Sequence, residues 1–110
     1  MIRDTISKIE AKLQHAGSLS EETKRELAIL LGTLKAEIGE LSKTDATQAQ
    51  KIAGFTENSA HQAILDEKDP ERLKLSLQEL SASVDGFERS HPNLVEVVNR
   101  ICTTLSNLGI

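Results

Sequence analysis

The sequence predicts an all-α protein, an antiparallel helical bundle of four to five helices with coiled-coil-like packing. Aliphatic residues recur in alternating steps of three and four through four stretches of the chain, a spacing that places them on one stripe of a helix. Aromatic residues make up 2% of the 110 residues, which argues against a β-sandwich or barrel. The stripes are Ile2, Ile6, Ile9 and Leu13; Leu27, Leu31, Leu34, Ile38 and Leu41; Leu73, Leu77, Leu80, Val84 and Phe87; and Leu94, Val98, Ile101, Leu105 and Leu108.

The first two predicted helices cover residues 2–16 and 18–43. Gly17 is typical of a helix C-terminal cap, and Ser18 with Glu21 has the spacing of a capping box. Because the link between the helices is so short, we expect them to lie antiparallel as a hairpin. Ile29 and Leu30 widen the apolar stripe of the second helix, which indicates that it contacts more than one neighbour.

The third predicted helix covers residues 45–68 and is capped by Thr44 or Asp45. Its stripe consists of small residues, and two interpretations of it stay open. Alanine favours helix wherever it occurs, or the small side chains form a close-packed face against small residues of the second helix. The stripe is Ala46, Ala49, Ala53, Thr56, Ala60 and Ala63, and its possible counterpart is Ala28, Gly32, Ala36 and Gly39.

The last two predicted helices cover residues 70–89 and 92–107. Asp69 and Pro70 have the order of an N-cap and a first-turn proline, although the residues alone leave open a turn or a kink in one long helix. Pro92 restarts the chain, with Asn93 and Glu96 as a second capping pair, and Val95 and Val97 widen the last stripe. Gly109 and Ile110 predict a Schellman-type ending.

Length and composition predict one helical domain over residues 1–110, with the hairpin in 1–43 and a C-terminal helical region in 44–110. The net charge is −4 and no stretch concentrates Lys or Arg, so nucleic acid is a poor candidate partner. The N-terminal residues do not read as a signal peptide and no apolar run would cross a membrane. With Cys102 as the single cysteine, we expect a cytoplasmic protein with no membrane partner.

Chemistry-bearing residues are few. Glu88 and His91 have the Glu-x-x-His spacing of di-metal bundles, but such a site needs two of these motifs and further inward-facing Glu residues. His91 also directly precedes Pro92, where a helix should break. Cys102 lies in an apolar helix and is expected to be a packed core thiol. We therefore expect no catalytic residue, no cofactor and no metal site, and a protein that is not an enzyme.

Near-heptad stripes without a catalytic constellation favour a non-catalytic, self-associating helical module that interacts with or regulates another protein. We expect a homo-oligomer, with a homodimer favoured as the commonest closed assembly, and a further protein partner remains open. The candidate self-association residues are Leu73, Leu77, Leu80, Val84, Phe87 and His91. The alternative function is a metal-binding helical-bundle enzyme or carrier.

Two motifs resemble a known family. They are Gly86-Phe87-Glu88-Arg89-Ser90-His91-Pro92 and the ending Leu105-Ser106-Asn107-Leu108-Gly109-Ile110, with a weaker likeness at Ala53-Gly54-Phe55-Thr56 and Ser59-Ala60-His61. The last half of the chain resembles a family of short uncharacterised bacterial proteins classed as a domain of unknown function. The resemblance implies a bacterial, cytoplasmic helical protein and carries no activity or catalytic residue. It also implies that Phe87, His91 and Pro92 form a structural corner or a docking point.

Overall fold

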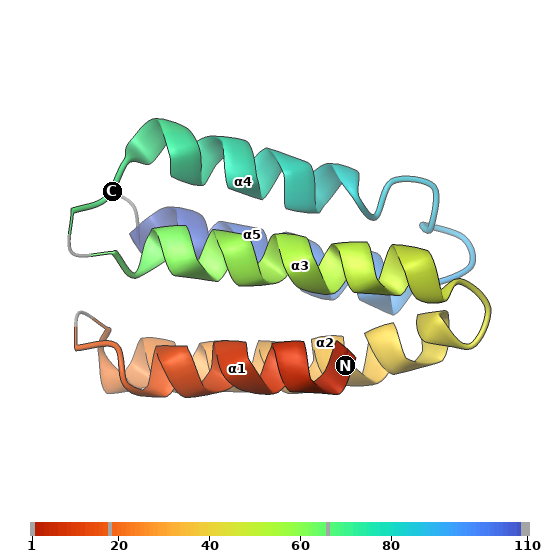
Figure 1. Ribbon diagram of the computed structural model, residues 1–110, viewed down its shortest axis with the longest axis horizontal. Coiled ribbons are helices and arrows are strands. Elements are labelled where there is room, and N and C mark those ends of the chain that lie inside the picture. The colour runs from red at the N-terminus through yellow and green to blue at the C-terminus, as the bar shows by residue number, and fades with distance from the viewer. Residues whose placement is uncertain (1, 18, 66, 109–110) are drawn as a thin grey trace.

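The computed structural model describes residues 2–17, 19–65 and 67–108 (Figure 1). This part of the chain forms five α-helices and no strand, which confirms the predicted all-α class. The helices are α1 (Ile2–Gln14), α2 (Glu21–Ser42), α3 (Ala46–Ala63), α4 (Pro70–Ala82) and α5 (Pro92–Leu108). No helix among the described residues is long and apolar enough to cross a membrane.

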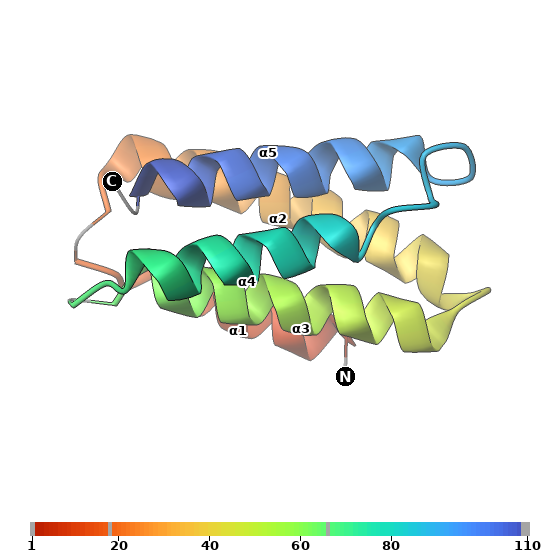
Figure 2. The same cartoon turned by 90° about the horizontal axis from the view of Figure 1, so that it is seen from above.

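Successive helices run in opposite directions, as the colour ramp of Figure 1 shows. Helices α2, α3 and α5 contact one another and make up a central trio. Helix α1 packs against α2 and α3, and α4 packs against α3 and α5 (Figures 1 and 2). Each outer helix therefore lies over one seam of the trio, α1 over the α2–α3 seam and α4 over the α3–α5 seam. Among the described helices, none lies over the remaining α2–α5 seam.

One hydrophobic core contains residues from all five helices. The expected stripes supply most of it, because the 3–4 spacing keeps their side chains on the inward face of each helix. Fully buried members include Ile6, Ile9, Leu27, Leu31, Leu34, Ile38, Leu41, Leu80, Leu94, Ile101 and Leu105. The contacts of α2 and α5 with several neighbours confirm that these helices are central. Ile29 is the exception, because it was expected in the widened stripe but is 69% exposed.

The small-residue face of α3 is buried in the core, with Ala49, Ala53, Ala60 and Ala63 almost fully covered. The face is thus part of the core except at Ala46, which is exposed. The expected counterpart on α2 is wrong, because Gly32 and Ala36 are exposed. A Cβ added to Gly32 would meet nothing within 4 Å. The larger stripe of α2, not its glycine face, points into the bundle.

Side-chain caps fix three of the helix starts. Ser20 Oγ accepts from Thr23 N at 3.1 Å, so the cap of α2 is two residues after the expected cap at Ser18, which lies outside the described residues. Asp45 caps α3 by accepting from Gln48 N at 3.0 Å, and Asp69 caps α4 by accepting from the backbone N–H groups of Glu71 and Arg72. A short polar side chain at each position satisfies N–H groups that the first turn leaves free.

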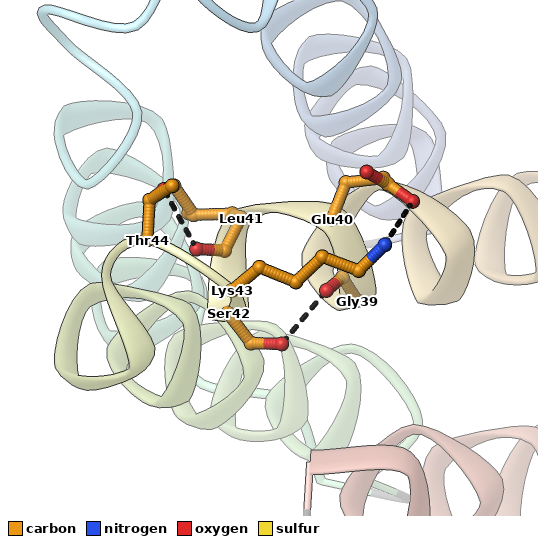
Figure 3. A network of polar contacts seen from close by, with 6 residues as sticks. All are labelled: Gly39, Glu40, Leu41, Ser42, Lys43 and Thr44. Atoms are coloured by element: carbon orange, nitrogen blue, oxygen red, sulfur yellow. Dashed lines mark hydrogen bonds and ion pairs between the residues drawn. The ribbon is translucent and has the colours of Figure 1, made fainter.

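Hydroxyl groups satisfy carbonyls at the end of α2 (Figure 3). Ser42 Oγ donates to the carbonyl of Gly39 at 2.7 Å, and Thr44 Oγ1 donates to the carbonyl of Leu41 at 3.2 Å. Lys43 Nζ lies 3.1 Å from Glu40 Oε1, which adds a cation near the negative end of the helix. These contacts end α2 in a short turn, and α3 begins at Ala46.

Two helices end earlier than expected. Helix α3 stops at Ala63 and not at residue 68, because the chain must reverse before Pro70 to bring α4 back along α3. Residues 69 and 70 therefore belong to a separate helix start and not to a kink. Helix α4 stops at Ala82 and not near residue 89, and turns with i→i+3 hydrogen bonds follow it. One of them passes through Gly86, whose φ of 95° is a conformation that glycine adopts without strain.

The last helix begins at Pro92 as expected, but Asn93 lies inside its first turn and is not its cap. The carbonyl of His91 accepts from Val95 N at 3.3 Å and makes the first hydrogen bond of α5. The helix continues to Leu108, one residue past the expected end. The ending predicted for Gly109 and Ile110 lies outside the described residues.

Candidate functional site

The six residues predicted for self-association lie on α4 and in the turns after it. Leu73, Leu80 and Val84 are buried in the chain's own core. Leu77 and Phe87 are partly buried against that core, and His91 is also half-exposed. The monomer fold thus covers one part of the stripe, and the other part keeps accessible surface. Their role in self-association stays a prediction.

Phe87, His91 and Pro92 lie at the corner between α4 and α5. The rings of Phe87 and His91 meet edge to face, with centroids 5.9 Å apart and planes inclined by 63°. The backbone N–H of His91 donates to the carbonyl of Phe87 at 2.8 Å, which closes the turn directly before Pro92. Such an aromatic pair adds a modest attraction to its buried area. The corner holds the start of α5 against the end of α4.

A groove of about 560 Å³ runs along the outer side of the α4–α5 pair. Leu73 and Leu77 of α4 and Cys102 of α5 contribute its apolar lining, and Lys74 is its charged residue. Thus two of the six predicted residues line this groove. The lining also includes the uncharged polar residues Gln78, Ser81, Thr103, Ser106 and Asn107, so a surface that packs here has to combine apolar contacts with hydrogen-bonding groups.

Leu75 adds an exposed apolar side chain to α4. It is 58% exposed and lines a shallow depression together with Lys74 and Gln78, which also line the α4–α5 groove. Lys74 and Gln78 thus lie between Leu75 and the apolar lining of the groove, and Leu75 lies off the face of α4 that carries Leu73 and Leu77. Charges along α4 balance, since Glu71 and Glu79 offset Arg72 and Lys74.

A second groove, of about 760 Å³, follows the uncovered α2–α5 seam. Ile29 and Leu30 of α2 and Pro92 and Val95 of α5 provide its apolar surface. Ile29 is the most exposed large aliphatic side chain among the described residues. Thr103 of α5 lines this groove and also the α4–α5 groove, so the two grooves lie on either side of one helix.

The rim of the α2–α5 groove is acidic. Glu26, Glu88 and Glu96 line it, against Arg100 as the basic residue. Arg100 lies 3.2 Å from Glu96 one turn away and is thereby paired on its own helix. Glu26 accepts a hydrogen bond of 3.2 Å from Thr104 Oγ1, and the ion pairs between described residues include neither Glu26 nor Glu88. The groove thus combines an apolar surface with a surplus of negative charge.

Glu88 and His91 are in the turns before α5 and not on one face of a helix. Glu88 Oε2 accepts a hydrogen bond of 2.8 Å from the backbone N–H of Gly86, so this carboxylate caps the turn. Among the described residues, no three His, Cys, Asp or Glu side chains gather as a metal ion would require. Of the two residues that motivated the metal-binding alternative, Glu88 thus makes a local backbone contact with Gly86, and His91 packs against the ring of Phe87.

Cys102 is half-buried between α5 and α4. Its Sγ–H lies 3.7 Å from the carbonyl oxygen of Leu77 and donates to it as a weak hydrogen bond. Burial raises the pKa of the Cys102 thiol to about 11, because the thiolate would lose solvation there. The thiol is therefore protonated near neutral pH, and it packs against the core as a half-buried residue and not as a fully buried one.

Sequence reasoning missed the exposure of Ile29 and the contribution of Leu75. Leu75 lies between two stripe positions, Leu73 and Leu77, so its place off the stripe was a readable sign of an outward-facing apolar residue. Ile29 likewise lies between two stripe positions, Leu27 and Leu31, but the continuous apolar run from Leu27 to Leu31 favoured the interpretation of a widened stripe. The acidic rim also could not be assembled from sequence, since it joins α2, α5 and the turn before α5.

The helices and grooves define an all-α bundle with accessible inter-helix grooves. The chain belongs to the family described as Domain of unknown function (DUF4404), whose model matches residues 29–110. The match includes most of α2 and all of α3, α4 and α5, and is longer than the half of the chain that carried the resemblance in the sequence. No curated protein and no solved structure matches the chain.

Proposed function

We propose that the protein is a non-catalytic helical interaction module that self-associates as a homodimer through α4 and the α4–α5 groove. The observation that carries the proposal is the exposed Leu75 of α4, a helix whose Leu73 and Leu77 also line the α4–α5 groove. A stable interface of standard size buries roughly 800 Å² on each copy. That is about one-eighth of the 6465 Å² surface of the chain, and the outer sides of α4 and α5 can supply it.

Charge balance favours a second copy as the occupant of this surface. In a twofold dimer the same patch meets itself, so a patch with a net charge would repel its copy. Glu71 and Glu79 match Arg72 and Lys74 in number, so the charges of α4 sum to zero and two copies would not repel through a net charge on this helix. The apolar side chains then lie at the centre of the interface and the charges at its rim.

The non-catalytic part of the proposal rests on the state of the residues suited to chemistry. Cys102 is protonated near neutral pH, and Glu88 is engaged by the backbone of Gly86. As part of the same proposal we place the protein in the cytoplasm of a bacterium, where a single unpaired cysteine is stable.

Sedimentation velocity of the whole protein tests self-association. We expect a dimer at about 50 µM, a concentration at which ordinary stable dimers are populated. Leu75→Glu should shift the protein to monomer while its helical circular dichroism remains, because Leu75 is exposed in the folded chain. Ile29→Glu is the matched control, since it places the same charge at an exposed aliphatic position on α2 and should leave the dimer intact.

A wild-type protein that sediments as a monomer at this concentration would count against the proposal. Equal loss of association in Leu75→Glu and Ile29→Glu would also remove α4 as the interface. Leu80→Glu is unsuitable as a first test, because Leu80 is fully buried and the substitution would unfold the bundle.

A further inference from the structure

The α2–α5 seam is the side of the central trio that the described chain leaves open. Helix α1 lies over the α2–α3 seam and α4 lies over the α3–α5 seam, and each of these outer helices has 13 residues. The open seam carries a groove of about 760 Å³ with Ile29, Leu30 and Val95 in its lining. Its shape and apolar surface are therefore those of a position where a short helix can pack.

We propose that this groove binds a basic amphipathic helix of another protein, about three to four turns long, with an aliphatic stripe flanked by Lys or Arg. On α5 the lining runs from Pro92 to Thr104, which corresponds to roughly 18 Å at about 1.5 Å per residue. A helix of the length of α1 or α4 spans this distance. The mode is a helix in a groove, in which aliphatic anchors at helical spacing enter the apolar surface.

Backbone hydrogen bonding favours a helix over an extended segment. The groove walls are α2 and α5, whose backbone groups are paired within the helices along the groove. An extended peptide would therefore find no strand edge and would leave its own N–H and C=O groups unpaired at the interface. A helix has already paired its backbone N–H and C=O groups internally and needs no such partners in the groove.

Charge selects the partner. Glu26, Glu88 and Glu96 outnumber Arg100 on the rim, and Arg100 is paired with Glu96. A partner with Lys or Arg on both sides of its aliphatic stripe would complement Glu26 and Glu88 and would be steered toward the groove. A second copy that brought its own α2–α5 face would instead set acidic rims against each other. An ion pair at the edge of a covered seam also exists inside the fold, with the charges exchanged, where Lys35 of α2 pairs with Glu10 of α1.

Fluorescence anisotropy with a labelled synthetic helix tests this assignment. The probe is a peptide of about 14 residues with leucines on one face, lysines on both flanking positions and alanines elsewhere. The matched control peptide has glutamates in place of the lysines. With the wild-type protein we expect saturable binding of the basic peptide in roughly the micromolar range, weaker binding at high salt, and at least about tenfold weaker binding of the acidic peptide.

Protein variants locate the binding site. Glu26→Lys combined with Glu96→Lys should weaken the basic peptide by about tenfold or more, and Ile29→Ser should weaken it by about tenfold. Glu67→Lys is the charge control, because Glu67 is exposed and lies outside both grooves. Leu75→Ser is the apolar control on α4. Both controls should bind the peptide with a Kd within about twofold of wild type.

Three results would overturn the inference. One is no saturable binding of the basic peptide at about 1 mM. Another is equal affinity for the basic and acidic peptides, a comparison that needs no variant. The third is dissociation of the self-associated protein by Ile29→Ser, which would make the groove an interface between copies. Failure of the dimer with intact peptide binding would instead remove only the proposed function.

Discussion

Lys35 Nζ of α2 lies 2.8 Å from Glu10 Oε1 of α1. The pair joins the two helices at the edge of the seam that α1 covers, and both side chains are about one-third exposed. An ion pair in this position is partly screened by water, so its contribution is small compared with that of the buried residues Ile6, Ile9 and Leu13. The ion pair contributes mainly to specificity, because it favours one placement of α1 along α2.

We expect Glu10→Lys and Lys35→Glu each to lower the free energy of unfolding by about 1 kcal/mol or less, because each places like charges together. The double variant restores an ion pair with the charges exchanged and should recover most of the loss. Urea denaturation of the four proteins gives the coupling energy directly. If the two losses simply add in the double variant, the pair does not contribute to the position of α1.

Leu31→Ala and Ile29→Ala compare two aliphatic residues on one helix. Leu31 is 1% exposed and Ile29 is 69% exposed. Leu31→Ala leaves a cavity in the core and should lower the free energy of unfolding by about 2–5 kcal/mol, whereas Ile29→Ala should change it by less than about 0.5 kcal/mol. Thermal denaturation measures both. A large destabilisation by Ile29→Ala would show that Ile29 packs inward, as the widened stripe had predicted.

Ser59 and Ser76 are both buried, but their hydroxyl groups differ in hydrogen bonding. Among the described residues Ser59 Oγ has no hydrogen-bond partner, whereas Ser76 Oγ accepts from Asn58 Nδ2 at 2.9 Å. Ser59→Ala removes an unsatisfied group and should raise the free energy of unfolding by up to about 1 kcal/mol. Ser76→Ala should lower it by about 1 kcal/mol, because it removes the acceptor of Asn58. Equal effects in chemical denaturation would contradict this account.

Cys102 should react slowly with a disulfide reagent in the folded protein. A pKa of about 11 in place of 9.0 leaves roughly a hundredfold less thiolate near neutral pH, and the thiolate is the reacting form. Reaction in urea should therefore be faster by about that factor. Because the folded pKa is raised above the unfolded one, the contribution of the protonated thiol to stability is present below pH 9 and is lost as the pH rises toward 11. A native reaction as fast as that in urea would exclude a buried thiol.

Sequence periodicity predicted the inward faces better than the helix ends. Val84 and Phe87 continue the stripe of α4, yet both follow the end of that helix at Ala82. Successive turns with i→i+3 hydrogen bonds have about 3.0 residues per turn, close to the 3.6 of an α-helix. Val84 therefore still reaches the core, and Phe87 still packs against it. Spacing alone therefore cannot distinguish the last helical turn from the turns that follow.

Side-chain chemistry at helix starts was predictable in part, since α2 is capped by Ser20 and Asn93 does not cap α5, whereas two other predicted caps are confirmed. Asp45 and Asp69 act within three residues of themselves; Asp69 caps α4 as expected, and Asp45 is the one of the two expected candidates, Thr44 or Asp45, that caps α3. The α2–α5 groove depends on how distant segments meet, because its rim joins Glu26 to Glu88 and Glu96. The positions of these three residues relative to one another depend on how the whole chain packs. The groove was therefore not predictable from the order of residues in the sequence.

Thr103 lines the α2–α5 groove on one side of α5 and the α4–α5 groove on the other. An occupant of either groove therefore touches the same helix at the same turn. By thermodynamic linkage, if a basic helix tightens the association of two copies by some factor, association must tighten the binding of that helix by the same factor. Any coupling between the two grooves across α5 would therefore be reciprocal. A partner helix that stabilises the dimer would itself bind more tightly to the dimer than to the monomer.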